Sequence, residues 1–149
     1  MNLTICTDAG RIDRLIQHPS IKPASFEVGM PDISMGVTMD RVTWLVFTEH
    51  GKDGGFMAID RRGLYWLDYH GGVLPAYRGA WALQALKTGI RFMFQTMGAH
   101  AITTHTPASN IGAQRINAAA GLKRTGIVPR AFYNGSFQDL VIYSINRSY

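Results

Sequence analysis

The alternation of apolar and polar positions predicts one long helix in the second half of the chain. Apolar side chains recur there every three or four residues, at Leu83, Leu86, Ile90, Met93 and Met97. Polar side chains fill the opposite face, so the segment is amphipathic. Glycine at position 98 predicts where this helix ends.

Runs of β-branched and aromatic residues predict strands on both sides of this helix. The runs before it cover residues 3–6, 43–48, 56–59 and 64–70, and the runs after it cover 99–104, 122–132 and 137–145. Clusters with glycine at 51–55 and 60–63 predict short turns, so the strands between 43 and 70 form an antiparallel meander. The order strand, long helix, strand predicts a parallel crossover from 64–70 to 99–104. Asn134-Gly135 predicts a hairpin between the last two strands.

Capping residues predict two shorter helices. Asp8 caps a helix that carries Ile12, Leu15 and Ile16 and ends before Pro19. Ser109 or Asn110 starts the other helix, which runs from Ile111 to Ala120 and ends at Gly121. The stretch from Ser20 to Asp40 has no clear period. We expect a long irregular segment there, with at most a short helix, that forms a wall of the substrate site.

Together these elements predict an α/β fold, with a mixed, mainly antiparallel twisted sheet of six or seven strands flanked by helices. The length of 149 residues suits a single domain, and the 46% of hydrophobic residues suits a globular one. The one cysteine, Cys6, excludes an internal disulfide and favours a reducing, cytoplasmic setting. We expect neither a secretion signal nor a membrane span, because no apolar run approaches the roughly 20 residues that a span needs.

The formal net charge is +5. It suits a solvated basic surface and, alternatively, an anionic partner. A polyphosphate cofactor, a nucleic acid and an acidic protein would all fit such a charge. The arginines are scattered along the chain and do not form a run, so nucleic acid is not the partner that we expect first.

The segment from Gly71 to Trp81, between a strand and the long helix, is a candidate anion site. A helix start offers free backbone N–H groups and the positive end of the helix dipole, which suit a pyrophosphate. Gly79 lets a phosphate approach the backbone, and Arg78 adds a charged donor. The loop contains neither Gly-x-x-x-x-Gly-Lys-Ser/Thr nor Gly-x-Gly-x-x-Gly. Taken alone, it is equally compatible with a purely structural turn.

Three patterns in this half of the chain jointly resemble the GNAT superfamily of acetyltransferases. The first, Val73-x-Pro75-x-x-Arg78-Gly79 before the long helix, looks like the acetyl-CoA loop of that family. The second is Asn110-x-x-Ala113 followed by Ile116 and Gly121-Leu122. The third is similar to the C-terminal hairpin of the branch that acetylates ribosomal-protein N-termini, and consists of Gly126, Arg130, Asn134-Gly135, Asp139 and Tyr143-Ser144. The resemblance covers Asp68 to Ser144 and implies a sheet with a splayed central pair of parallel strands.

This resemblance implies acetyl-CoA as the co-substrate and an amine as the acceptor. The pantetheine arm would lie between the splayed strands, the backbone N–H near Val73 would hold the oxyanion, and residues 77–81 would bind pyrophosphate. The residues that it implies for cofactor binding are Val73, Leu74, Tyr77, Arg78, Gly79, Ala80, Trp81, Asn110 and Asn117.

Three residues depart from the family pattern. Ala76 and Trp81 stand at the first and last positions of the loop consensus Gln/Arg-x-x-Gly-x-Gly/Ala. The indole of Trp81 either blocks the groove or points into the core and leaves its backbone N–H free. Asn117 stands where the family commonly has a tyrosine that protonates the leaving thiolate. An asparagine cannot do so, and a proton from water would have to serve.

Asp68 and His70 are the candidate catalytic base. Residues two apart in a strand share a face, and a histidine side chain titrates close enough to neutral pH to accept the proton of an amine. The alternative interpretation is a surface pair or a hydrogen bond within the sheet. The histidines at other positions show no metal-ligand spacing, so we expect no metal site; they are His18, His50, His100 and His105.

We therefore expect an acetyl-CoA-dependent N-acetyltransferase that acts on a protein N-terminus, a lysine or a small amine. The alternative is a catalytically inactive GNAT-like binding or assembly module, for example a virion- or head-associated bacteriophage protein, which Ala76, Trp81 and Asn117 favour. Such a module would be virion-associated rather than cytoplasmic. A basic nucleic-acid or ribosome-associated module is the third interpretation. Whether the chain forms a homodimer stays open.

Overall fold

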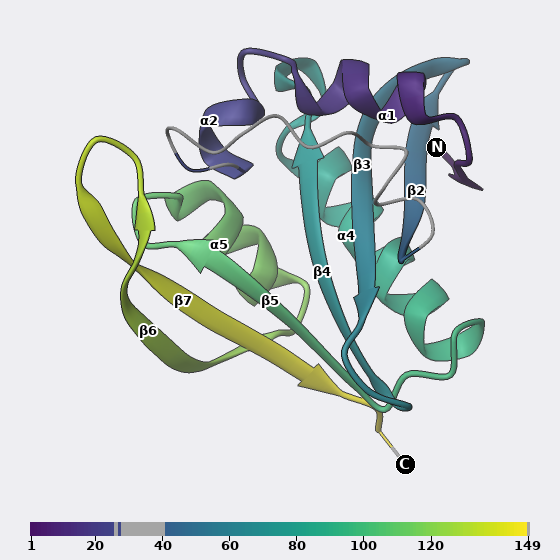
Figure 1. Ribbon diagram of the computed structural model, residues 1–149. Helices are drawn as coiled ribbons and strands as arrows, with labels where there is room; N and C mark the ends of the chain where they lie inside the picture. Colours follow the sequence, from purple (N-terminus) through teal and green to yellow (C-terminus); the bar gives the residue numbers. More distant parts are fainter. Residues whose placement is uncertain (26, 28–40, 149) are drawn as a thin grey trace.

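The computed structural model describes residues 1–25, 27 and 41–148. These residues form a seven-stranded sheet in the order β1-β2-β3-β4-β5-β7-β6 (Figure 1). The strands are β1 Asn2–Ile5, β2 Val42–Glu49, β3 Lys52–Arg61, β4 Trp66–Val73, β5 Ala101–Pro107, β6 Lys123–Tyr133 and β7 Phe137–Asn146. Every neighbouring pair is antiparallel except β4 and β5, which run parallel. The predicted fold class, a mixed and mainly antiparallel sheet, is confirmed.

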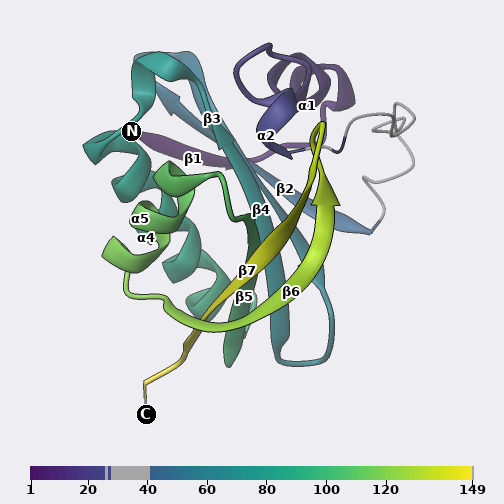
Figure 2. The ribbon, with the colours of Figure 1, turned by 90° about the vertical axis from the view of Figure 1, so that its left-hand side faces the viewer.

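Helices cover both faces of the sheet. They are α1 Ala9–Ile16, α2 Lys22–Ser25, α4 Ala80–Gln95 and α5 Ile111–Ala119, with a 3-10 turn, η1, at Pro75–Tyr77. Figure 2 shows α4 and α5 on one face and α1 and α2 on the other. Of the helices in the described part of the chain, none has the length and apolar composition needed to cross a bilayer.

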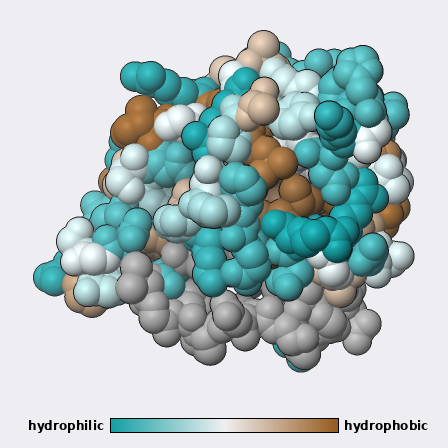
Figure 3. Space-filling view, turned by 90° about the horizontal axis from the view of Figure 1, so that it is seen from above, coloured by the Kyte–Doolittle hydropathy of each residue, from teal (hydrophilic) through white to brown (hydrophobic). Residues whose placement is uncertain are grey.

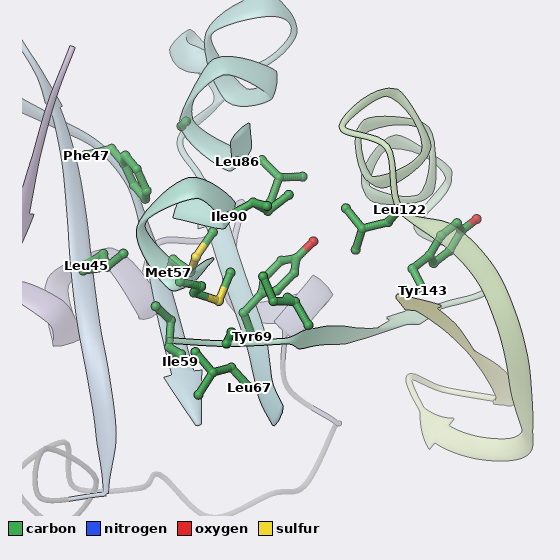
Figure 4. Close-up of a cluster of buried hydrophobic side chains, with 14 of the residues drawn as sticks. Leu45, Phe47, Met57, Ile59, Leu67, Tyr69, Leu86, Ile90, Leu122 and Tyr143 are labelled. Carbon is green, nitrogen blue, oxygen red and sulfur yellow. The ribbon is translucent and has the colours of Figure 1, made fainter. Parts of the chain in front are cut away.

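The alternation of side chains along the strands divides the interior into two cores. Leu45 and Phe47 of β2 pack on the α4 side, in a cluster with Tyr69, Leu86 and other apolar residues (Figure 4). Trp44 and Val46 point the opposite way and pack with Ile12 and Leu15 of α1. Because successive strand residues face opposite sides, this run of buried residues in β2 supplies both cores at once.

The capping residues act as the sequence predicted. The Asp8 carboxylate accepts the backbone N–H of Arg11 at 3.0 Å, at the start of α1. The Asn110 side chain accepts the N–H of Ala113 at 3.1 Å, so Asn110 and not Ser109 is the N-cap of α5. A side-chain acceptor at this position satisfies one of the N–H groups that a helix start leaves free.

The boundaries of both predicted turns differ from the expectation: the first turn is shorter, and the second covers residues 62–65 instead of 60–63. The turn after β2 is confined to His50 and Gly51, and β3 already begins at Lys52, so Gly54 and Gly55 lie inside a strand. Likewise β4 begins at Trp66, not at residue 64, and continues beyond His70 to Val73. Its Gly72 pairs with Phe56, whose ring lies where a β-carbon on Gly72 would be, 2.7 Å from Cε1. Gly54 and Gly72 leave room for aromatic rings, Gly55 lies against the main chain of Gly72, and none of the three is a turn residue.

The predicted irregular segment from Ser20 to Asp40 is described only at its start. The short helix α2 lies there, at Lys22–Ser25. Phe26 and residues 28–40 lie outside the described residues, so the wall predicted for that stretch stays a prediction.

The central parallel pair of strands splays apart. β4 and β5 pair only where Trp66–Asp68 meets Ala101–Thr103. Beyond Asp68, β4 stays with β3 as far as Val73, and β5 stays with β7 as far as Pro107. The sheet therefore opens between the ends of its two central strands (Figure 1), as the family resemblance implied.

Candidate active site

The opening between β4 and β5 holds a cavity of about 350 Å³. Its wall on the α4–α5 side includes Tyr69, Trp81, Ala82 and Asn117, and its wall on the opposite side includes Ala24, Glu27, His70, His105 and Phe132. Seen from the end of the sheet where the strands diverge, a patch of hydrophobic side chains lies among mostly hydrophilic ones (Figure 3). The cavity thus connects the two faces of the sheet through the gap.

Backbone groups of β4 line this gap. The N–H of Leu74 donates to the carbonyl of Gly54 at 2.9 Å, which ties this residue to β3. Main-chain groups of alternate residues point to opposite neighbours, so those of Gly71 and Val73 point toward β5. By the same alternation, the carbonyl of Tyr69 points toward β5, where it accepts the hydroxyl of Thr104 at 2.8 Å. In the described chain, β4 pairs with β5 only as far as Asp68. The main-chain groups of Gly71 and Val73 that point away from β3 therefore face the cavity and have no partner strand on that side.

The start of α4 provides the predicted free amides, but the row is shorter than expected. The N–H groups of Leu74, Tyr77 and Arg78 are engaged by carbonyls of Gly54, Leu74 and Pro75. From Gly79 to Ala82, no acceptor among the described residues takes the N–H, and Leu83 is the first to bond, to Gly79 at 3.1 Å. Gly79 has a φ of 81°, and nothing lies within 4 Å of the β-carbon that it lacks. The open space and the helix dipole make this end of the helix suitable for an anion.

The side chain of Trp81 turns away from these amides. Its indole N–H donates to Oε2 of Glu49 on β2 at 2.9 Å. The ring packs against Tyr77, with the centroids 4.9 Å apart, and lies over Gly54. The Met1 ammonium, followed by this indole, lowers the pKa of Glu49 below its usual value. Of the two orientations left open by the sequence, the structure has the one that leaves the backbone N–H of Trp81 free and the cavity open.

Arg78 and Asn110 have structural contacts of their own. The guanidinium of Arg78 donates to the carbonyl of Ser20 at 3.2 Å, which joins the loop to the segment before α2. Asn110 lines the cavity while its side-chain oxygen caps α5. Asn117 is buried, and both ends of its amide are engaged: its oxygen accepts the hydroxyl of Tyr69 at 2.8 Å and its nitrogen donates to Thr106 at 3.2 Å.

Asp68 and His70 lie together on the α2 side of the gap. The Asp68 carboxylate is fully buried, and its Oδ1 accepts the hydroxyl of Thr103 at 2.6 Å. Nε2 of His70 lies 3.3 Å from Oδ2, while 55% of the His70 side chain is exposed. Burial raises the pKa of Asp68, but its contacts with His70 and Thr103 outweigh burial, so the pKa lies below the usual value. The pair thus consists of a fixed carboxylate and an accessible imidazole.

One oxygen of this carboxylate remains without a well-aligned hydrogen bond. Among the described groups, none donates to the buried Oδ2 of Asp68 with hydrogen-bond geometry, although Nε2 of His70 is within ion-pair distance. A modest reorientation of the imidazole would complete the bond. Hydrogen bonds between catalytic groups are often this loose before substrate is bound.

Sequence reasoning did not include His105 in the site. Its Nδ1 lies 3.4 Å from Oδ1 of Asp68, and its ring lies 6.3 Å from that of His70. Asp68, His70 and His105 bring their ligand atoms within 4.8 Å of one another, a grouping that could hold a metal ion. Thr103 and the guanidinium of Arg62, 3.7 Å from Oδ2, already interact with this carboxylate. A carboxylate compensated in this way suits an acid–base pair better than a metal centre.

The signal for His105 was in the register of the parallel pair. Asp68 lies opposite Thr103, so the residues two further along each strand, His70 and His105, share a face next to each other. The spacing of histidines along one segment, which the sequence argument used, carries no information about contacts between two strands.

Comparison with known proteins identifies the fold. The sequence matches no model of a protein family and none of the curated proteins. Among solved structures, spermidine N-acetyltransferase from Vibrio cholerae in complex with CoA and spermine is similar with a TM-score of 0.82 at 17% identity, over 97% of this chain and 94% of that one. Ribosomal-protein-S5-alanine acetyltransferase from Vibrio fischeri gives 0.77 at 16% identity, over 97% and 91%. A GNAT-family acetyltransferase from Bacillus anthracis gives 0.76 at 14%, over 98% and 95%. The chain therefore has the fold of the GNAT acetyltransferases.

Proposed function

We propose that this protein is an acetyl-CoA-dependent N-acetyltransferase that acetylates an amine by direct attack. One observation carries the proposal. The cavity between β4 and β5 has free backbone amides at the start of α4 on one side and the Asp68–His70 pair on the other. A thioester donor and an amine acceptor can therefore meet in the gap from opposite faces of the sheet.

The free amides suit a polyphosphate-bearing donor. The N–H groups of Gly79 to Ala82 would bind its pyrophosphate, because no described residue accepts them and the space beside Gly79 is open. The main chain of Gly71 and Val73 offers strand-like hydrogen bonds to an arm that carries amide groups, which is the chemistry of pantetheine. Solved structures with this fold include one in complex with CoA, which supports acetyl-CoA as the donor.

The Asp68–His70 pair would act as the base. Its imidazole takes a proton from the amine as the nitrogen attacks the acetyl carbonyl. The buried carboxylate of Asp68 orients the imidazole and stabilises the charge that develops on it. The N–H of Val73 lies on the gap side of β4 and would donate to the oxyanion of the tetrahedral intermediate.

The acceptor is an amine, and the structural neighbours act on more than one class of amine. Two of the similar structures act, by their names, on spermidine and on an alanine of a ribosomal protein, so both a small polyamine and a protein N-terminus are candidates, together with lysine. Trp81 does not favour an inactive module, because its indole donates to Glu49 and lies away from the free amides.

Thermal unfolding with and without acetyl-CoA tests the binding step. Ligand at one hundred times its Kd should add about 2.7 kcal/mol to the free energy of unfolding. Gly79→Ala should remove most of this effect, because a β-carbon would enter the open space beside the amides. Gly98→Ala is the matched control, since Gly98 has a similar φ of 73° and equally open surroundings but lies beyond the other end of α4. A folded protein that shows no stabilisation at millimolar acetyl-CoA would contradict the proposal.

Release of free CoA thiol in the presence of spermidine, lysine or N-terminal peptides tests the chemical step. His70→Ala should lose about 100-fold or more in turnover and keep the stabilisation by acetyl-CoA. His50→Ala, at a turn where 91% of the side chain is exposed, should behave like the wild type. Equal turnover in the two variants would exclude His70 as the base.

A further inference from the structure

Tyr69 lines the cavity and carries a buried hydroxyl that has no role in the proposed reaction. The side chain is only 4% exposed, and the residue lines the cavity. Figure 4 shows the ring rising from β4 toward α4, with its oxygen toward the cluster that α4 and α5 cover. The hydroxyl donates to the side-chain oxygen of Asn117 at 2.8 Å. A tyrosine in an apolar strand is usually a packing residue, yet the hydroxyl of this one bonds Asn117, which also lines the cavity.

Tyr69 and His70 face opposite sides of the gap because they are neighbours in one strand. His70 shares its face with Asp68, on the α2 side, whereas Tyr69 packs with Leu86 of α4. In the proposed function the donor is anchored at the start of α4. Its sulfur therefore reaches the gap from the Tyr69 side, while the amine arrives from the His70 side.

The reaction leaves a negative charge on that sulfur. The amine nitrogen forms a bond to the acetyl carbon and gives its proton to His70, the C–S bond then breaks, and its electron pair remains on sulfur as a thiolate. Two nearby polar groups of the wall already donate elsewhere: the hydroxyl of Thr104 bonds the carbonyl of Tyr69, and the amide nitrogen of Asn117 bonds Thr106. The hydroxyl of Tyr69 can turn about its C–O bond from Asn117 to another acceptor.

We infer that Tyr69 donates a hydrogen bond to the departing thiolate and so acts as a further catalytic residue. The inference rests on the proposed function. No proton needs to leave the phenol, because a thiol is more acidic than a phenol, and the thiolate takes its proton later from solvent. Burial raises the pKa of Tyr69, which keeps this donor protonated over the working range of pH.

Tyr69→Phe removes the donor and keeps the ring. We expect kcat to fall about 10- to 100-fold, as for the loss of one hydrogen bond to a charged group, with the Kd of acetyl-CoA unchanged. Tyr143→Phe is the matched control. Tyr143 is also buried and also donates to a side chain of α5, Gln114 at 3.3 Å, but it is not among the residues that line the cavity. The Tyr143→Phe variant should have a kcat within about threefold of that of the wild type.

The thiol of bound CoA gives a second measurement, which a packing role would not change. We expect the pKa of this thiol, followed by thiolate absorbance, to be lower on the wild type and on Tyr143→Phe than on Tyr69→Phe. If Tyr69→Phe fails to fold, 3-fluorotyrosine at position 69 retains ring and hydroxyl, and its stronger donor should lower the thiol pKa further. An active wild type with equal kcat or equal thiol pKa in Tyr69→Phe overturns this inference alone. A wild type that neither binds acetyl-CoA nor transfers acetyl overturns the proposed function as well.

Discussion

A methyl group added to Gly54 should disturb the wall of the cavity through the aromatic rings that cover this glycine. A β-carbon there would lie 2.6 Å from Cη2 of Trp81 and 2.9 Å from Cγ of Tyr77, well inside van der Waals contact. The backbone of β3 cannot yield easily, because it pairs with β2 on one side and β4 on the other. The indole of Trp81 must therefore move and give up its hydrogen bond to Glu49.

We expect Gly54→Ala to lower the free energy of unfolding by about 1–3 kcal/mol, the usual cost of overpacking a tight interior. In a chain of this length each kcal/mol lowers Tm by roughly 2–4 °C. Urea and thermal unfolding measure this change. Binding of acetyl-CoA should also weaken, because Trp81 belongs to the first turn of α4, which carries the free amides. Gly63→Ala is the control, since its β-carbon would meet only Cβ of Trp66, at 3.8 Å.

A double-mutant cycle isolates the clash. Trp81→Ala removes the ring that Gly54→Ala would strike, so the two substitutions should cost less together than the sum of their separate effects. Additive effects, or a Gly54→Ala protein as stable as Gly63→Ala, would refute the assignment of Trp81 to this position.

Three further changes test the site and the caps. The pKa of Asp68 lies below its usual value, so its carboxylate stabilises the folded chain above the unfolded pKa, and this contribution is lost as the pH falls through the folded pKa. Asp68→Asn should therefore lose less stability than the wild type between about pH 7 and about pH 3, as measured by urea unfolding at both values. Thr103→Val should raise the pKa of Asp68, followed by NMR titration, whereas Thr103→Ser keeps the 2.6 Å hydrogen bond and should not. Asn110→Ala should cost about 0.5–2 kcal/mol in thermal unfolding through the lost cap of α5, and Asn110→Ser should recover most of it; a variant as stable as the wild type would contradict the cap.

Local patterns were sufficient to predict the elements that depend on local physics. The amphipathic period from Leu83 to Met97 identified α4, although the helix ends at Gln95, before the predicted Gly98. The caps at Asp8 and Asn110 were predicted because their hydrogen bonds reach only three residues along the chain. The order of elements around α4 was enough to predict the parallel pair, because a crossover of this kind has essentially one arrangement.

The features that the sequence did not predict depend on contacts between distant segments. Gly54 and Gly55 looked like a turn because nothing local shows that the ring of Trp81, 27 positions later, covers this part of β3. His105 joins Asp68 only through the register of β4 and β5. Tyr69 received no role from the sequence, since its bond to Asn117 spans 48 positions.

The reliance of the donor site on main-chain groups has a consequence for divergence. If Gly71, Val73 and the residues from Gly79 to Ala82 bind through their amides, most side chains around the site can be replaced without loss of the contact, provided that the backbone keeps its path. Selection then acts on the course of β4 and on the glycine at position 79, and only weakly on the residues between them. This chain is only 14–19% identical to such structural neighbours and still has their fold, so a site made of main-chain groups could outlast the exchange of most side chains.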